Sequence, residues 1–83
     1  ESIAFKAFRV SSSGYVRKKY VREFVFQKCQ SKCMNCGETQ ELHIDHIESV
    51  YLCFKNKRFQ YCNTVDNLQL LCSDCNLRKG KKS

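Results

Sequence analysis

The chain has 83 residues, of which 15 are Lys or Arg and 8 are Asp or Glu, so its formal net charge is +7 at pH 7. Three glycines and no proline exclude collagen-like and low-complexity sequences, and no apolar run approaches the roughly 20 residues of a membrane-spanning helix. A domain this small buries only about 60–65% of its unfolded surface. We therefore expect another source of stability, and the seven cysteines are the candidates.

The first fourteen residues show no clear periodicity. The apolar side chains at Ile3, Phe5, Phe8 and Val10 fit neither a helix nor a strand, and residues 11–14 (SSSG) are the one linker-like stretch. We therefore interpret residues 1–14 as an N-terminal extension, or as a linker to a region outside this chain.

Residues 15–30 carry two adjoining i,i+4 rows of apolar side chains. The rows are Val16, Tyr20 and Phe24, and Val21, Val25 and Cys29. The basic residues of this segment fall mostly outside the two rows, so the pattern predicts an amphipathic helix.

Four cysteines form two C-x-x-C pairs, Cys33 with Cys36 and Cys72 with Cys75. Two intervening residues let both thiolates of a tight turn, or zinc knuckle, bind one tetrahedral zinc ion. Gly37 follows the first pair, where such a turn usually needs a positive φ. Disulfides are the alternative, but seven is an odd number of cysteines. We expect a structural zinc site with four cysteine ligands.

The other cysteines, Cys29, Cys53 and Cys62, have no partner at knuckle spacing, so we expect them to be small buried residues. Residues 37–71 separate the two knuckles, which is more chain than a minimal zinc ribbon needs. A folded segment is therefore expected between them, with zinc holding its two ends together.

The segment between the knuckles contains two predicted strands. Residues 41–48 alternate, with Leu42, Ile44 and His46 on one side and His43, Asp45 and Ile47 on the other. Residues 67–71 (NLQLL) predict a second short strand. A short final helix should begin near Ser73 or Asp74, run to about Lys79 and end at Gly80.

Residues 49–65 join these strands, and we expect a hairpin or a long loop there. Aromatic residues flank a basic tip formed by Lys55, Lys57 and Arg58. The aromatic side chains Tyr51, Phe54, Phe59 and Tyr61 can either stack on nucleic-acid bases or pack internally, and packing is the favoured interpretation.

Three motifs in this region together resemble a known family. They are LHIDHI (42–47), DNLQLL (66–71) and CNLRKGKK (75–82), in this order and between or beside the two knuckles. The chain resembles the HNH nucleases of the ββα-metal, or His-Me finger, fold over residues 32–82. The resemblance implies an α+β fold, with a ββα-metal motif stapled by the four-cysteine zinc site and preceded by an amphipathic helix. The nuclease domain would span residues 15–83, with knuckles at 33–36 and 72–75.

The resemblance also implies a role for five residues. His46 matches the general base, Asp45 a carboxylate ligand of the catalytic metal, and Asn76 the second metal ligand. Asn67 matches the residue that pins the connecting loop, and Lys79 a basic position near the phosphate. Because the third motif residue is Asn, this is the H-N-N variant, whose oxygen ligands favour Mg²⁺ or Mn²⁺. The chain lacks the Gly-Gly of many relatives after the first strand.

Strict alternation places Asp45 and His46 on opposite faces of the first strand. Both must reach one phosphate in the implied mechanism, so we expect the strand to twist or end at this point. Taken alone, His46 is more often a surface or structural histidine than a base.

The positive charges suit a nucleic-acid partner. The candidate phosphate contacts are Lys55, Lys57, Arg58, Arg78, Lys79, Lys81 and Lys82. We expect double-stranded DNA as the substrate. A non-catalytic, zinc-stabilised nucleic-acid-binding module and an RNA-directed nuclease are the alternatives. One such site cuts one strand, so a homodimer or a larger multidomain nuclease is expected for a double-strand break. We expect no membrane association and an intracellular location, in the host cell if a phage encodes the protein.

Overall fold

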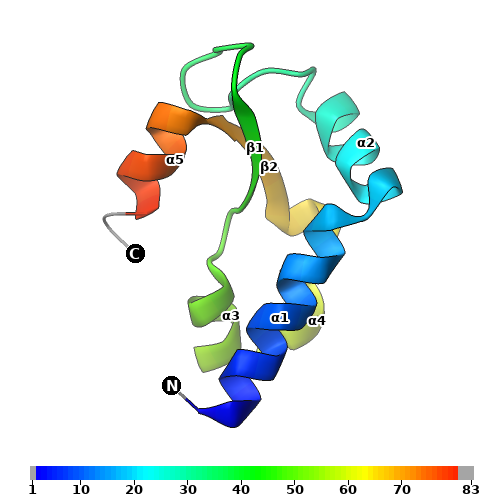
Figure 1. The fold of residues 1–83 in the computed structure, drawn as a ribbon, viewed down its shortest axis with the longest axis vertical. Helices are drawn as coiled ribbons and strands as arrows, with labels where there is room; N and C mark the ends of the chain where they lie inside the picture. The colour runs from blue at the N-terminus through cyan, green and yellow to red at the C-terminus, as the bar shows by residue number, and fades with distance from the viewer. Residues whose placement is uncertain (1, 81–83) are drawn as a thin grey trace.

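The computed structural model describes residues 2–80 and combines helices with one small sheet (Figure 1). The helices are α1 (Ile3–Arg17), α2 (Lys19–Lys28), α3 (Val50–Lys55), α4 (Phe59–Cys62) and α5 (Ser73–Gly80), and a 3-10 turn spans Val65–Asn67. The strands β1 (Leu42–His46) and β2 (Leu68–Cys72) pair antiparallel. This α+β architecture confirms the expected fold class. No helix within residues 2–80 is both long and apolar enough to cross a bilayer.

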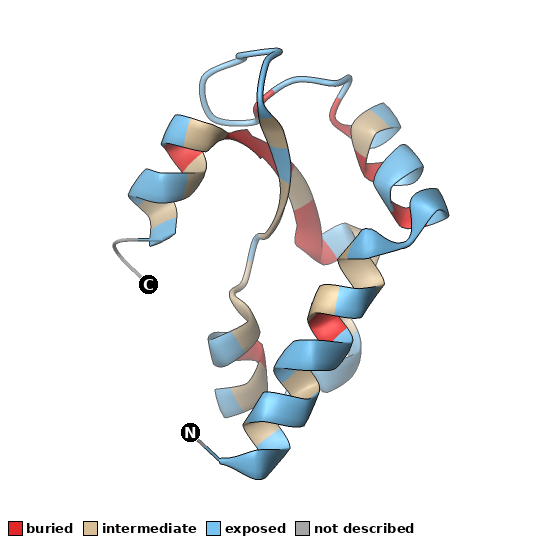
Figure 2. Cartoon of the chain, viewed as in Figure 1, coloured by how far each residue is buried: buried red, intermediate tan, exposed pale blue. Residues whose placement is uncertain are grey.

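The sheet is the centre of the fold, with α5 on one side and α2 on the other (Figure 1). Both predicted strands form, and the register pairs Ile44 with Leu70 and His46 with Leu68. Leu68 and Leu70 are fully buried against Val21 and Val25 of α2, as the buried colouring of β2 and α2 shows in Figure 2. β1 ends at His46, so the strand ends where the sequence required a twist or an end.

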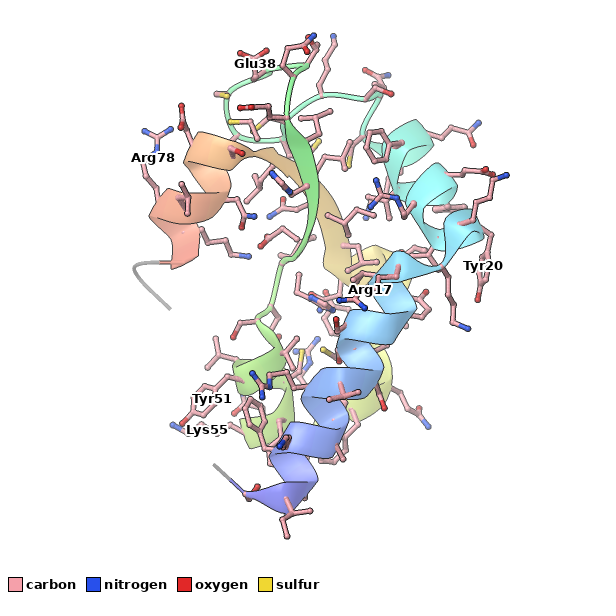
Figure 3. All side chains as sticks on the ribbon, viewed as in Figure 1. Arg17, Tyr20, Glu38, Tyr51, Lys55 and Arg78 are labelled. Atoms are coloured by element: carbon pink, nitrogen blue, oxygen red, sulfur yellow. The ribbon has the colours of Figure 1, made fainter. Side chains whose placement is uncertain are left out.

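The predicted helix over residues 15–30 is divided into two helices. Lys18 has an extended backbone (φ −64°, ψ 133°) and separates α1 from α2. The break has a packing reason, because α1 lies against α3 whereas α2 lies against β2. The row containing Val21 and Val25 is buried as an amphipathic helix requires, and Tyr20 of the other row is exposed (Figure 3).

The linker predicted at residues 11–14 is wrong, because these residues lie inside α1. The helix begins after Ser2, whose hydroxyl accepts a hydrogen bond from the backbone N–H of Phe5. Ser12 is fully buried, and its Oγ lies 3.9 Å from Sγ of Cys62. Small side chains at this point therefore allow α1 to approach the segment between the strands closely.

The hairpin or long loop predicted for residues 49–65 is also wrong. The segment forms α3 and α4, and Ser49 caps α3 by accepting a hydrogen bond from the backbone N–H of Leu52. The helices are stabilised by aromatic ring contacts with α1, at centroid distances of 5.3–5.9 Å. The rings in contact are Phe5, Phe8, Tyr51, Phe54 and Phe59. The internal packing that the sequence favours for Tyr51, Phe54 and Phe59 is therefore confirmed.

Lys28 fixes the start of β2 from the end of α2. Its ammonium donates hydrogen bonds to the carbonyl oxygens of Val65 (2.8 Å) and Leu68 (2.9 Å). These carbonyls lie in and just after the 3-10 turn that leads into the strand. One of the basic residues of the predicted amphipathic helix therefore has an internal role, and the strand it fixes carries residues of the candidate site.

Candidate functional site

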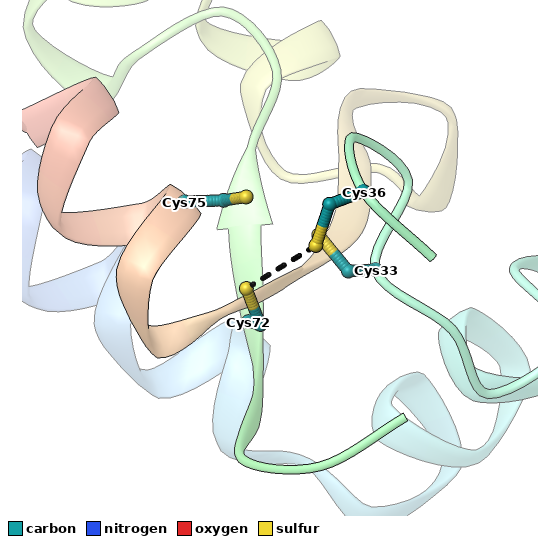
Figure 4. A group of neighbouring side chains, drawn as sticks. All are labelled: Cys33, Cys36, Cys72 and Cys75. Carbon is teal, nitrogen blue, oxygen red and sulfur yellow. Dashed lines mark hydrogen bonds between the residues drawn. The ribbon is translucent and has the colours of Figure 1, made fainter. Parts of the chain in front are cut away.

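The four cysteines of the two C-x-x-C pairs meet in one cluster (Figure 4). Their sulfur atoms all lie within 4.8 Å of one another, and those of Cys36 and Cys72 are 3.7 Å apart. Four sulfurs bound tetrahedrally to zinc at 2.3 Å would be separated by about 3.8 Å. The separations are close to this value, so the cluster can hold a zinc ion, and Cys33, Cys36, Cys72 and Cys75 are the residues that would bind it.

The surroundings of the thiols favour ionisation at two of the four positions. Burial raises the pKa of Cys33, but hydrogen bonds from backbone amides, including that of Cys36, outweigh it and lower the pKa to about 6. A hydrogen bond from the side chain of Asn35 lowers the pKa of Cys75. At Cys36 a hydrogen bond from the backbone of Glu38 lowers the pKa of the thiol. The neighbouring sulfurs of Cys72, Cys33 and Cys75 have the larger combined effect, and they raise this pKa to about 12. Four thiolates this close need a cation to be stable together.

The first knuckle is held in place by backbone hydrogen bonds. Gly37 has φ +83°, the left-handed conformation expected of it, and its N–H donates to the carbonyl of Cys33. The N–H of Met34 donates to the carbonyl of Leu70 in β2. The knuckle is therefore attached to the strand that leads directly into Cys72 and α5.

Cys29, Cys53 and Cys62 are buried and lie outside the four-cysteine cluster. Cys29 packs in the core with Val21 and Val25. Burial, together with the neighbouring Cys62, raises the pKa of Cys53 to about 12, so this thiol stays protonated. These three cysteines are small buried residues, as expected from their spacing.

A second group of polar side chains lines an open hollow of about 230 Å³ between the end of β1 and α5. Asp45 and His46 reach it from β1, and Asn76 and Lys79 reach it from α5. Four of the five residues given roles by the resemblance thus come together around one space. They do so because His46 is the last residue of the strand and Asn76 lies in the first turn of α5.

Asp45 has two hydrogen-bond donors in the structure. Its Oδ2 accepts from Nζ of Lys79 at 2.5 Å and from Nε2 of Gln69 at 3.0 Å. Gln69 stands directly opposite Asp45 in the sheet register. No sequence motif marks Gln69 as part of the site, and its contact with Asp45 follows only from the register between the two strands.

The imidazole of His46 is held neutral by its surroundings. Burial lowers its pKa below the ordinary 6.5, against the opposing effects of the Asp45 charge and the side chain of Asn63, while the charge of Lys79 lowers it further. Nε2 of His46 and Oδ1 of Asn63 are both buried and have no hydrogen-bond partner among the described residues. Asn63 follows α4 and carries no sequence signal that marks it as part of the site.

Asn67 makes the side-chain to backbone hydrogen bonds expected of it. Fully buried, it accepts from the N–H of Glu48 (2.8 Å) and donates to the carbonyls of Glu48 and Cys62, each at 3.1 Å. Glu48 lies two residues after the end of β1. Asn67 therefore fixes the path of the chain as it leaves the hollow, without lining the hollow itself.

The predicted phosphate contacts are dispersed. Lys55 and Arg78 are exposed at separate places (Figure 3), and Lys57 is exposed beyond α3. Arg58 is engaged internally, through an ion pair with Glu48 (3.5 Å) and a cation–π contact with Tyr61 (4.3 Å). Arg78 donates to Sγ of Cys75. Lys81 and Lys82 lie outside the described residues.

His43, the other histidine, also lies on β1 but is separate from this hollow. It is exposed, and its Nε2 lies 3.1 Å from the hydroxyl of Ser73. The chain thus offers two histidines on one strand, of which only His46 faces the candidate catalytic groups. This contrast provides a natural control for experiments.

Together the fold and the two sites define a small α+β protein whose ββα unit carries one group of four sulfur atoms that could hold a metal ion and one group of residues with oxygen and nitrogen side chains. Residues 33–82 match the family model described as HNH endonuclease. The chain is also 36% identical over 76 residues to a protein of Lactococcus phage SK1 named probable HNH endonuclease, a match that covers 84% of this chain and 79% of that protein. No solved structure matches significantly. The chain belongs to the HNH endonuclease family, which supports a nuclease function.

Proposed function

We propose that this protein is a DNA endonuclease that hydrolyses phosphodiester bonds, with His46 as general base and with Asp45 and Asn76 as ligands of one Mg²⁺ or Mn²⁺ ion. The observation that carries the proposal is that these three residues line a single open hollow. A carboxylate and an amide offer the oxygen atoms that hard divalent cations prefer, so the donor set fits the ion.

His46 is suited to removing a proton from water at neutral pH, because its lowered pKa keeps the ring neutral. An Nε2–H pointing toward Oδ1 of Asn63 would satisfy two buried polar atoms at once. In that tautomer Nδ1 carries the lone pair that accepts the proton. Asn63 is then a positioning residue, which fixes the ring and its tautomer.

The remaining residues place the reacting groups. Gln69 orients the carboxylate of Asp45, and Asn67 holds the backbone that follows His46. A divalent cation bound by Asp45 and Asn76 would stabilise the negative charge that develops on the phosphate and on the leaving oxygen. The net charge of +7 and the exposed Lys55, Lys57 and Arg78 favour an anionic polymer as substrate. Members of this family act on DNA, which supports DNA over RNA.

The test is a nicking assay on supercoiled plasmid with Mg²⁺ or Mn²⁺, using His46→Ala and the matched control His43→Ala. We expect His46→Ala to lower the cleavage rate by about 10²–10⁴-fold while retaining DNA binding in a gel-shift assay. His43→Ala should cleave at close to the wild-type rate, because its side chain contacts Ser73 and not the hollow.

Each alternative function has its own outcome in the same assay. Binding of DNA without cleavage in either metal would indicate a non-catalytic binding module. Faster cleavage of an RNA of matched sequence would indicate an RNA-directed nuclease. Cleavage by His46→Ala at the wild-type rate would exclude His46 as the base.

A further inference from the structure

Lys79 places a positive charge on the carboxylate of Asp45. Its ammonium lies 2.5 Å from Oδ2 of Asp45, donates to the carbonyl of His46 and lies 3.3 Å from the carbonyl of Ile47. The contact is partly shielded from water, because the side chain of Asp45 is 13% exposed and that of Lys79 is 32% exposed. The ammonium is therefore bound by oxygens of the same kind that bind a hard divalent cation.

A divalent cation and the ammonium of Lys79 bound to the same Oδ2 of Asp45 would repel each other, so each weakens the binding of the other. We propose that Lys79 is a built-in competitor for the divalent cation at Asp45, and that its ammonium leaves the carboxylate when the ion binds. The inference rests on the proposed role of Asp45 as a metal ligand, and it adds to that role an exchange between an internal cation and the ion.

The structure provides space for the displaced side chain. Lys79 lines the hollow at His46 and also a larger neighbouring hollow of about 460 Å³. Arg78 and Asn35 line the larger hollow as well. An ammonium that moves into it would stand near a guanidinium, and two neighbouring cations favour a phosphate group. The exchange would thus convert an internal ion pair into a substrate contact.

The carboxylate stays in position during this exchange. Gln69 donates to the same Oδ2 of Asp45 from the opposite strand at 3.0 Å, and this contact does not depend on Lys79. Removal of the lysine charge is therefore expected to free a carboxylate that is still correctly oriented. This makes substitution of Lys79 a direct measure of the competition.

The experiment measures Mn²⁺ binding to the zinc-loaded protein by electron paramagnetic resonance, without DNA and without turnover. The proteins are wild type, Lys79→Met, Asp45→Asn and the double variant. Lys6→Met is the matched control, because it removes one exposed charge from α1, away from the hollow. We expect Lys79→Met to bind Mn²⁺ on the order of tenfold more tightly than wild type, and Lys6→Met to bind like wild type.

The double variant separates this inference from the proposed function. If Asp45→Asn weakens Mn²⁺ binding and Lys79→Met tightens it only when Asp45 is present, the competition is established. If Asp45→Asn weakens binding but Lys79→Met leaves it unchanged or weaker, the competition is refuted while Asp45 remains a ligand. If Asp45→Asn leaves Mn²⁺ affinity unchanged, the proposed metal site itself fails, and the competition fails with it.

A second measurement uses the wild-type protein and does not depend on any variant folding. Acylation of lysines by an activated ester, followed by peptide mass mapping, reports how accessible each ammonium is. Mg²⁺ should increase the acylation rate of Lys79 several-fold relative to that of Lys6. An unchanged ratio at saturating Mg²⁺ would overturn the proposal, because the ammonium would then have remained on Asp45.

Discussion

The two candidate metal sites both include residues of α5 and differ in how complete they are. The four-cysteine cluster has four ligands of one kind, with all sulfurs within 4.8 Å of one another. The hollow at Asp45 brings together a carboxylate, an imidazole and an amide, and Lys79 already occupies the carboxylate. The difference shows that the first site offers the four ligands with which structural zinc sites close around their ion, whereas the second is open and has room for substrate and water.

The largest expected effect is that of removing zinc. A structural zinc site contributes an apparent 10–16 kcal/mol, which is similar to the total stability of a small domain of about 5–15 kcal/mol. A chelator strong enough to strip the cysteine cluster should therefore unfold the protein, as measured by far-UV circular dichroism together with zinc quantification. Omitting Mg²⁺ while retaining zinc should leave the spectrum unchanged. A native spectrum after complete zinc loss would show that the four-cysteine site is not needed for folding, and would contradict this difference between the two sites.

A smaller loss of stability is expected for Asn67→Ala, which affects the support of the open site. The substitution leaves the partly buried N–H of Glu48 and the buried carbonyl of Cys62 without their partner, so we expect a loss of about 2–4 kcal/mol in the free energy of unfolding. Urea denaturation of the zinc-loaded protein measures it. Asn56→Ala is the matched control, because Asn56 is exposed at the end of α3 and its substitution should cost under about 0.5 kcal/mol. Equal losses in both variants would contradict the role of Asn67.

The smallest expected effect is a shift in the pH profile of cleavage. Because burial lowers the pKa of His46 below 6.5, the ring remains a competent base below that pH. The rate should stay level through neutral pH and fall only as the pH drops through the lowered pKa. The unfolded chain binds this proton more readily than the folded one below about pH 6.5, so stability should decrease in the same direction.

Substitution of Asn63 tests whether the acidic limb of the pH profile reports the pKa of His46. Its side chain raises the pKa of His46, against the dominant effect of burial. Asn63→Ala should therefore move the acidic limb of the profile to still lower pH and also reduce the maximal rate, because the ring loses its orientation. A lower rate with an unmoved acidic limb would indicate that Asn63 has only a structural role.

The parts of the molecule that follow local rules could be predicted from the sequence. The alternation in residues 41–48 predicted β1, and the two C-x-x-C pairs predicted that their four cysteines would lie together. The structure contains both features. The family motif predicted that Asp45, His46 and Asn76 would lie together, which the structure shows. In each case the determining signal lies within a few residues or in a fixed order of motifs.

The errors lie where distant contacts determine the local structure. Residues 49–65 form helices whose aromatic rings contact Phe5 and Phe8, and residues 11–14 are helical where they pack against the same region. Neither pattern is visible in a short window of sequence. Gln69 and Asn63 were overlooked for a related reason, since the first depends on strand register and the second on the path of the chain after α4.

Cys75 and Asn76 are neighbours in the first turn of α5, and they point to different sites because successive residues of a helix are rotated by about 100°. Inserting a single residue between them would rotate Asn76 and the rest of the helix away from Asp45, while Cys75 would keep its position in the four-cysteine cluster. We therefore expect homologous chains that keep both sites to keep this spacing, and we expect changes in chain length to fall in other segments.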